Sequence, residues 1–267
     1  MKEYFALLLK KYFPQLYKYL IDKKEGRYDF QFSESLYPGS FLNTNEKPPK
    51  KPNFLTEKIF VFWTGNNEMS HNRKKGLLSI REKAEVPVVL VTESNLNDFI
   101  LENFPLHPAY NLLSLVHRSD YLRCYFMHHY GGGYADVKTF HHSWKNAFKK
   151  LRKKNDHYII GYPEVGGIAQ VGGKLYDDLK FHMPLLIGNG AFICKSYTIF
   201  TSEWYRELHR RMDYYYDDLV KFSNDEISDY PVPYTSMQGQ IFHPLVLKHH
   251  KKALRDKNLM PDFINYR

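Results

Sequence analysis

The chain has 267 residues, of which 43% are hydrophobic and 16% aromatic, and it carries a formal net charge of +9 at pH 7. This length fits one large domain, or one domain with a small appendage, and the apolar content excludes a wholly disordered chain. The positive charge favours acidic partners, which are nucleotides, nucleic acid or an anionic membrane surface. No apolar run approaches the roughly 20 residues that a membrane-spanning helix needs.

The two cysteines, Cys124 and Cys194, lie among apolar and aromatic residues. Two cysteines cannot build a disulfide framework or a four-cysteine zinc site. We therefore expect buried free thiols, as in a protein of the reducing cytoplasm.

The first 53 residues differ in character from the rest. Residues 1–24 are predicted to be helical with a break at Pro14, and they mix aromatic residues, leucines and lysines at helical spacing. This stripe fits a helix packed on the domain, and it also fits a helix on the anionic inner face of a membrane. Residues 26–53 are rich in Pro, Asn, Ser and Lys and indicate an irregular connector. We therefore predict an N-terminal helical appendage and connector over 1–53 and one domain over 54–267.

Beyond residue 53, short apolar runs alternate with segments of helical spacing. The predicted strands cover 58–65, 86–93, 134–140 and 157–165, with one or two more in 183–196, and the predicted helices cover 71–84, 94–104, 110–130 and 201–222. This alternation predicts an α/β fold of the Rossmann-like, doubly wound type, with a mostly parallel sheet flanked by helices. Ligands of such sheets bind beyond the carboxyl ends of the strands.

Two familiar nucleotide signatures are absent. The chain has no GxxxxGK[ST] phosphate loop, and no GxGxxG follows its first predicted strand. Other groups must therefore hold the phosphates of any bound nucleotide.

The stretch SLVHRSDYLRCYFMHHYGGGYADVKTF gathers charged side chains around three glycines. Asp120 and Arg123 lie on one face of the predicted helix, where an isolated ion pair contributes only a few tenths of a kcal/mol. One of Gly131–Gly133 can end this helix in the left-handed conformation, and three glycines predict a close approach to the backbone. Asp136 and Lys138 then point to one side of the next strand. We expect the four charged side chains to converge on a crevice that suits a ligand with hydroxyls and phosphates.

The segment SDYLRCYFMHHYGGGYADV resembles the sugar-binding region of the DxD glycosyltransferases, which have the GT-A fold. That family includes mannosyltransferases, the glucosyltransferase domains of large clostridial toxins and bacterial capsular-polysaccharide transferases. Its shared pattern is Ser-Asp-x-x-Arg on a helix, then Tyr-Gly-Gly-x-Tyr and Asp-x-Asp on the next strand. The resemblance extends to KIFVFWTG upstream and GQIFHPLV downstream, and covers about residues 55–250.

The resemblance implies a function and a set of partners. It implies transfer of a hexose from a nucleotide sugar, a UDP-sugar first, to a hydroxyl of a glycan or lipid-linked saccharide. The anomeric configuration would be retained, and the pathway would be capsule or lipopolysaccharide biosynthesis.

The resemblance also implies roles for individual residues. Asp120 and Arg123 would grip the hydroxyls of the donor sugar. Lys138, which departs from the family pattern, joins them in the predicted catalytic set because its ammonium can neutralise the diphosphate. The implied substrate-binding residues are Trp63 and Thr64 at the base, then Gly132, Gly133, Tyr134, Asp136, Asn189, Gly190, Gln238 and His243. Three of these positions have plainer interpretations, which are a core aromatic at Trp63, an ordinary turn at Asn189–Gly190 and a histidine packed in a helix at His243.

The second aspartate of the family pattern is Lys138 in this chain. The family uses that aspartate to bind a divalent cation, often Mn²⁺. A protonated lysine cannot ligate a cation, but its ammonium can neutralise a diphosphate directly. One interpretation is therefore transfer with weak or absent dependence on Mn²⁺ or Mg²⁺. A second places the metal on Asp136, His243 and the oxygens of the diphosphate, and a third is a pseudoenzyme that binds a sugar nucleotide without turnover.

Two further interpretations concern acids and net charge. An inverting enzyme needs a carboxylate near the acceptor hydroxyl, and Asp225, Glu226 and Asp229 are candidates by position, although a solvated loop is the plainer interpretation. The charge also fits a nucleic-acid-binding protein, but the basic runs are scattered and no binding motif is present. We therefore expect no nucleic-acid partner.

Overall fold

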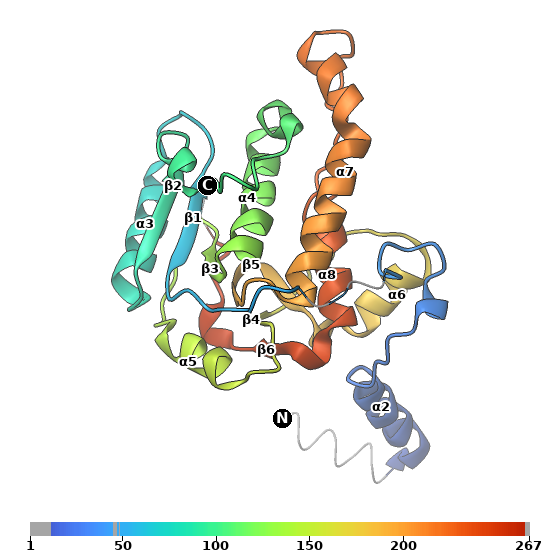
Figure 1. The fold of residues 1–267 in the computed structure, drawn as a ribbon. Helices are drawn as coiled ribbons and strands as arrows, with labels where there is room; N and C mark the ends of the chain where they lie inside the picture. The colour runs from blue at the N-terminus through green and yellow to red at the C-terminus, as the bar shows by residue number, and fades with distance from the viewer. Residues whose placement is uncertain (1–11, 45–46, 48, 265–267) are drawn as a thin grey trace.

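The computed structural model describes residues 12–44, 47 and 49–264, and these residues form an α/β fold (Figure 1). Within the described part, one six-stranded sheet has the strand order β2-β1-β3-β5-β4-β6. The strands are β1 (Ile59–Trp63), β2 (Val88–Thr92), β3 (Gly132–Ala135), β4 (Ile159–Pro163), β5 (Ile187–Cys194) and β6 (Ala253–Arg255). The α-helices are α2 (Pro14–Gly26), α3 (His71–Lys83), α4 (Leu115–His129), α5 (Lys145–Lys153), α6 (Gly173–Phe181), α7 (Ile199–Ser223) and α8 (Gly239–Lys248).

The sheet is mixed, because one strand runs against the others. β1 pairs in parallel with β2 and β3, and β4 pairs in parallel with β6. β5 is antiparallel to both of its neighbours, β3 and β4. The prediction of a mostly parallel sheet is confirmed. The reversal of β5 brings its first residues to the edge where the parallel strands end, since Ile187 pairs with Pro163 and Ala191 pairs with Ala135.

Helices cover both faces of the sheet, as the alternation along β1 shows. Phe60 and Phe62 pack in one core with residues of α4, α7 and α8, whereas Ile59 and Val61 pack in a second core with residues of α3 and α5. Successive side chains of a strand point to opposite faces, so this division follows directly from the apolar run. Figure 1 shows α4 and α7 running side by side on the first face. Cys124 and Cys194 are buried free thiols, as predicted.

Two predicted elements differ from the structure. Residues 94–104 do not form an α-helix but a short 3₁₀ turn (Leu96–Phe99). Here the Asn95 side chain accepts a hydrogen bond from the Thr92 N–H and donates one to the Leu90 carbonyl, which favours a turn over a helix. The strand predicted over 134–140 is β3, which ends at Ala135, and Asp136 starts a turn in which its carbonyl accepts from the Lys138 N–H.

The N-terminal segment partly joins the main core. α2 begins at Pro14, where a proline in the first turn leaves no helical hydrogen bond unmade. The helix predicted over residues 1–11 lies outside the described residues. Phe30, Tyr37 and Leu42 of the connector are buried in the core formed with α4 and α7, and the domain boundary at residue 53 stays a prediction. No helix among the described residues is long and apolar enough to cross a membrane.

Candidate functional site

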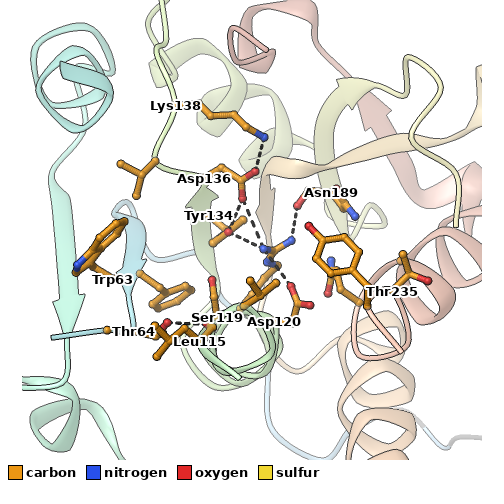
Figure 2. A pocket seen from close by; sticks show the side chains of 18 of the residues that line it. Trp63, Thr64, Leu115, Ser119, Asp120, Tyr134, Asp136, Lys138, Asn189 and Thr235 are labelled. Atoms are coloured by element: carbon orange, nitrogen blue, oxygen red, sulfur yellow. Dashed lines mark hydrogen bonds and ion pairs between the residues drawn. The ribbon is translucent and has the colours of Figure 1, made fainter. Parts of the chain in front are cut away.

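A pocket of about 710 Å³ opens at the carboxyl ends of β1 and β3, beside the start of β5. Its volume is typical of small-molecule sites. Its lining comes from the end of β1 and the residues after it, from α3, from α4, from β3 and the turn that follows, and from the start of β5. Two further segments complete it, with Gly167 and Ala169 from one and Tyr234, Thr235, Gln238 and Gly239 from the other. Figure 2 shows side chains from these elements pointing into one hollow. This edge of the sheet is where the fold class predicts a ligand.

Helix α4 carries two of the charged side chains into this pocket. It begins at Ser114, whose hydroxyl accepts a hydrogen bond from the His117 N–H. Its last residue is His129, and Gly131, just beyond it, has a left-handed backbone at φ +62° and donates its N–H to the Phe126 carbonyl. A glycine therefore does end the helix, as predicted.

Gly132 and Gly133 do not line the pocket. A Cβ on Gly132 would lie 2.8 Å from the Lys58 carbonyl oxygen, and one on Gly133 would lie 2.9 Å from Ile59 Cγ1 and 3.1 Å from the Trp144 ring. The close approach that three glycines predict is made by the protein's own chain, and substrate contact at these two glycines stays a prediction.

Arg123 is the centre of the polar network in the pocket. Its Nη1 donates to the Asn189 carbonyl at 2.9 Å, and its Nη2 donates to the Tyr134 hydroxyl at 2.7 Å. The same Nη2 lies 3.3 Å from Asp120 and 3.6 Å from Asp136. This guanidinium therefore contacts both carboxylates, and Figure 2 shows Asp120 and Asp136 on the same side of the pocket as Tyr134. Arg123 therefore joins α4, β3 and β5 at one point.

Asp136 is engaged at both carboxylate oxygens. Oδ1 accepts from the Tyr134 hydroxyl at 2.6 Å, and Oδ2 accepts from Lys138 Nζ at 2.7 Å. The Asp136 side chain is 22% exposed and the Lys138 side chain 12%. The four charged side chains predicted to converge thus meet in one partly buried cluster.

The two carboxyls of this cluster differ in their acidity. Burial raises the pKa of Asp120 to about 7, with Asp136 adding to the rise and Arg123 opposing it. Burial also tends to raise the pKa of Asp136, but Lys138 and Arg123 together hold that pKa below its ordinary value. Asp136 therefore stays a carboxylate, and Asp120 titrates near neutral pH.

Asn189 and Gly190 lie within strand β5 and not in a turn. The Gly190 carbonyl accepts the Asp136 N–H at 2.8 Å, and a Cβ on Gly190 would lie 3.0 Å from Asp136 Oδ2. Asn189 lines the pocket. Gly190 does not line it and instead makes room for the Asp136 carboxylate, and substrate binding at Gly190 stays a prediction.

Trp63 and Thr64 stand at the end of β1 on one side of the pocket (Figure 2). Trp63 is half-buried, and its Nε1 donates to the Asn67 carbonyl at 2.8 Å. The Thr64 hydroxyl donates to the Leu115 carbonyl at 2.7 Å and so ties β1 to the start of α4. The Trp63 ring lines the pocket and is not a wholly buried core aromatic.

His243 is not part of the pocket lining. Its side chain is fully buried in α8, and its Nε2 lies 3.1 Å from Glu164 Oε2. Glu164 Oε1 also accepts backbone N–H groups from Val165, Gly166 and Gly167, so this pair supports the loop beside the pocket. The helix directs the His243 ring into the interior, so contact of His243 with a diphosphate or a metal stays a prediction that the pocket lining does not support.

The donor set of the pocket does not fit a divalent cation. Such ions take several oxygen ligands, and both Asp136 oxygens already have partners. No group of three or more His, Cys, Asp or Glu side chains suited to a metal occurs among the described residues. His243 lies on Glu164 and outside the pocket lining, so a cation held by Asp136 and His243 stays a prediction.

Other lining residues were not predicted from the sequence. Arg73 of α3 lines the pocket and donates to the Val137 carbonyl at 2.7 Å, so it adds a third cation beside Arg123 and Lys138. Arg73 lies in the first turn of the helix that follows the first strand, and this position could have identified it as a residue of the pocket. Tyr234 and Thr235 also line the pocket, and no local pattern marks them. Gln238 lines the pocket, as expected of a substrate-binding residue.

The acidic loop after α7 lies apart from the pocket lining. Asp225, Glu226 and Asp229 are exposed and do not line it. The structure therefore favours the solvated-loop interpretation of these three acids.

The sequence was compared with known families and with curated proteins. Residues 23–228 match the family described as capsular polysaccharide synthesis protein. A search of curated proteins found no match to the chain.

Proposed function

The chain belongs to the capsular polysaccharide synthesis protein family, and we propose that it is a glycosyltransferase. In this proposal it moves a hexose from a nucleotide sugar, a UDP-sugar first, to a hydroxyl of a glycan or lipid-linked saccharide. The observation that carries the proposal is the pocket at the carboxyl edge of the sheet, where two carboxylates and three cations converge. Cations suit a diphosphate, and carboxylates accept hydrogen bonds from sugar hydroxyls.

The donor lies across the pocket in a defined order. Trp63 stacks on the base, because an exposed aromatic face on a fixed strand end is a ready platform. Lys138 and Arg73 neutralise the diphosphate. Asp120 and Arg123 hold the hydroxyls of the sugar in the middle of the pocket.

In the reaction, the bond between the anomeric carbon and the diphosphate oxygen breaks, and its electron pair stays on the diphosphate. The acceptor hydroxyl attacks the anomeric carbon from the same face, and its proton passes to the departing phosphate oxygen. Positive charge develops on the sugar and negative charge on the diphosphate, and Lys138 and Arg123 stabilise the latter. Retention of configuration is an expectation from the family resemblance.

A divalent cation has no step in this mechanism. The ammonium of Lys138 stands where the family pattern has a metal-binding aspartate, and it neutralises the diphosphate as a fixed charge. We therefore propose turnover that does not depend on Mn²⁺ or Mg²⁺.

A peripheral membrane position forms a second, separate part of the proposal. Leu16 and Leu20 of α2 are 47% and 43% exposed, and Lys18 lies on the same helix. Apolar and basic side chains on an exposed helix suit the surface of an anionic membrane on its inner face. Flotation with anionic liposomes tests it, and equal flotation of the full chain and its Leu16→Ser, Leu20→Ser variant would contradict it.

Thermal unfolding with nucleotide sugars tests the main proposal. We expect UDP-, GDP- or CMP-sugars of one nucleotide class to raise the melting temperature, both with Mn²⁺ and with EDTA, because a ligand that binds only the native state stabilises it. Release of free nucleotide then measures turnover. A shift without release would identify a pseudoenzyme, and the absence of any shift would contradict donor binding.

A further inference from the structure

Gln238 is a buried amide in the pocket wall that lacks a hydrogen-bond partner. The residue is 3% exposed and lines the pocket. Neither its Oε1 nor its Nε2 has a partner in the protein. It precedes α8, but its side chain makes no capping bond to that helix. Buried polar groups are normally satisfied, so a carboxamide left open towards a pocket points to a ligand.

Gln238 adjoins Gly239, which lies beside Ala169 and Thr235 on the side of the pocket away from Trp63. Figure 2 shows Trp63 and Thr64 at one side, Thr235 at the other and Asp120 between them. We call this second side the Gln238 wall, and it consists of Gly167, Ala169, Tyr234, Thr235, Gln238 and Gly239. In the proposed function, the base and the diphosphate occupy the Trp63 side and the donor sugar lies over Asp120. The Gln238 wall is then the space left for the acceptor.

Tyr234 forms the outer rim of this wall. Its side chain is 73% exposed. Its backbone is held against α4, because His117 Nε2 lies 3.2 Å from the Tyr234 carbonyl and His117 Nδ1 lies 2.9 Å from the Tyr230 hydroxyl. An exposed ring on an anchored backbone offers a flat apolar face, which fits the C–H face of a pyranose.

The Gln238 wall contains no carboxylate, ammonium, guanidinium or imidazole side chain. The amide of Gln238 can both donate and accept, as sugar hydroxyls do. The charged residues of the pocket gather instead around Asp136, where the donor lies. The wall is thus suited to an uncharged ligand.

We propose that the Gln238 wall is the acceptor subsite, and that it binds a neutral pyranose. The carboxamide of Gln238 binds a hydroxyl of this sugar, and the Tyr234 ring stacks on its apolar face. This inference rests on the proposed glycosyl transfer, and it adds the class of acceptor residue and the side chains that select it.

Saturation-transfer NMR on the full chain, with and without saturating UDP, tests this subsite. The probes are the methyl glycosides of glucose, galactose, mannose and N-acetylglucosamine, with methyl glucuronide as the charged comparison. We expect at least one neutral glycoside to bind and the glucuronide to bind more weakly. Tyr234→Ala and Gln238→Met should each weaken binding about tenfold, which corresponds to about 1.4 kcal/mol.

Two further variants separate the subsite from general effects. Tyr234→Phe keeps the ring and should bind as the wild type does. Tyr214→Ala removes an equally exposed ring, 73% exposed and outside the pocket, and should change nothing. Melting temperatures confirm that Gln238→Met, which preserves side-chain length, is folded.

Specific results would overturn the inference. These are the absence of binding by every neutral glycoside, binding that survives both Tyr234→Ala and Gln238→Met, or preference for the glucuronide. If a nucleotide sugar still raises the melting temperature in that case, donor binding stands and only the acceptor subsite falls. Glycoside binding without any nucleotide effect would instead contradict the proposed donor.

Discussion

Replacing Lys138 with methionine tests whether its ammonium neutralises the diphosphate in place of a metal ion. The substitution keeps an unbranched side chain but removes a charge that is 12% exposed and lies 2.7 Å from Asp136 Oδ2. Asp136 keeps its contacts with Arg123 and the Tyr134 hydroxyl, so the pocket retains most of its network. A hydrogen bond to a charged group contributes about 1.5–3 kcal/mol. Loss of one such contact to the diphosphate should raise the Kd for UDP by about 10- to 150-fold.

Isothermal titration of UDP in EDTA at low salt measures this effect. Lys221→Met is the matched control, because Lys221 is 50% exposed on α7 and lies outside the pocket, so the net charge changes equally. We expect the control to bind UDP as the wild type does. A Lys138→Met variant that binds UDP within about threefold of the wild type would refute the reasoning, since that is under 1 kcal/mol. Binding by the wild type only in the presence of Mn²⁺ would refute it as well.

Three more predictions concern stability, each measured as the free energy of unfolding in urea. Gly133→Ala should lose about 1–3 kcal/mol, because the added methyl would lie 2.9 Å from a buried isoleucine; an unchanged midpoint would show that the core yields. Burial lowers the pKa of His129 to about 3, so the folded protein keeps this ring neutral while the unfolded chain takes up a proton below about pH 6.5, and stability therefore falls as the pH drops from 6.5 towards 3. By pH 5 the free energy of unfolding should have fallen by about 2 kcal/mol. His129→Gln should reduce this fall, whereas the control His141→Gln, which changes a side chain 61% exposed, should not. Equal acid sensitivity of the two variants would contradict the prediction. The His243 ring and loop N–H groups outweigh burial and hold the pKa of Glu164 at about 2, so this carboxylate stabilises the fold above about pH 4.5. Glu164→Gln should cost about 3 kcal/mol at pH 7 and little at pH 2, and a pH-independent cost would argue against the ion pair.

Local patterns in the sequence determined the class of fold and the charged cluster of the site. Apolar runs and helical spacing identify β1, α3, β2, α4, β4 and α7, because side-chain periodicity is a property of neighbouring residues. The spacing of Asp120 and Arg123 on one helix turn, and of Asp136 and Lys138 beyond a helix-ending glycine, is equally local. These four side chains could therefore be placed together before the fold was known.

Contacts between distant segments decided the rest. Strand β5 runs against its neighbours because of its place between β3 and β4, which no feature of its own residues announces. Gly132 and Gly133 are required by the packing of β1 and α5 against them. His243 turns inward because Glu164, 79 positions earlier in the chain, offers it a buried partner. The Gln238 wall lies opposite Trp63 because α8 packs against the sheet. Such packing joins residues far apart in the chain, so no short stretch of sequence predicts it.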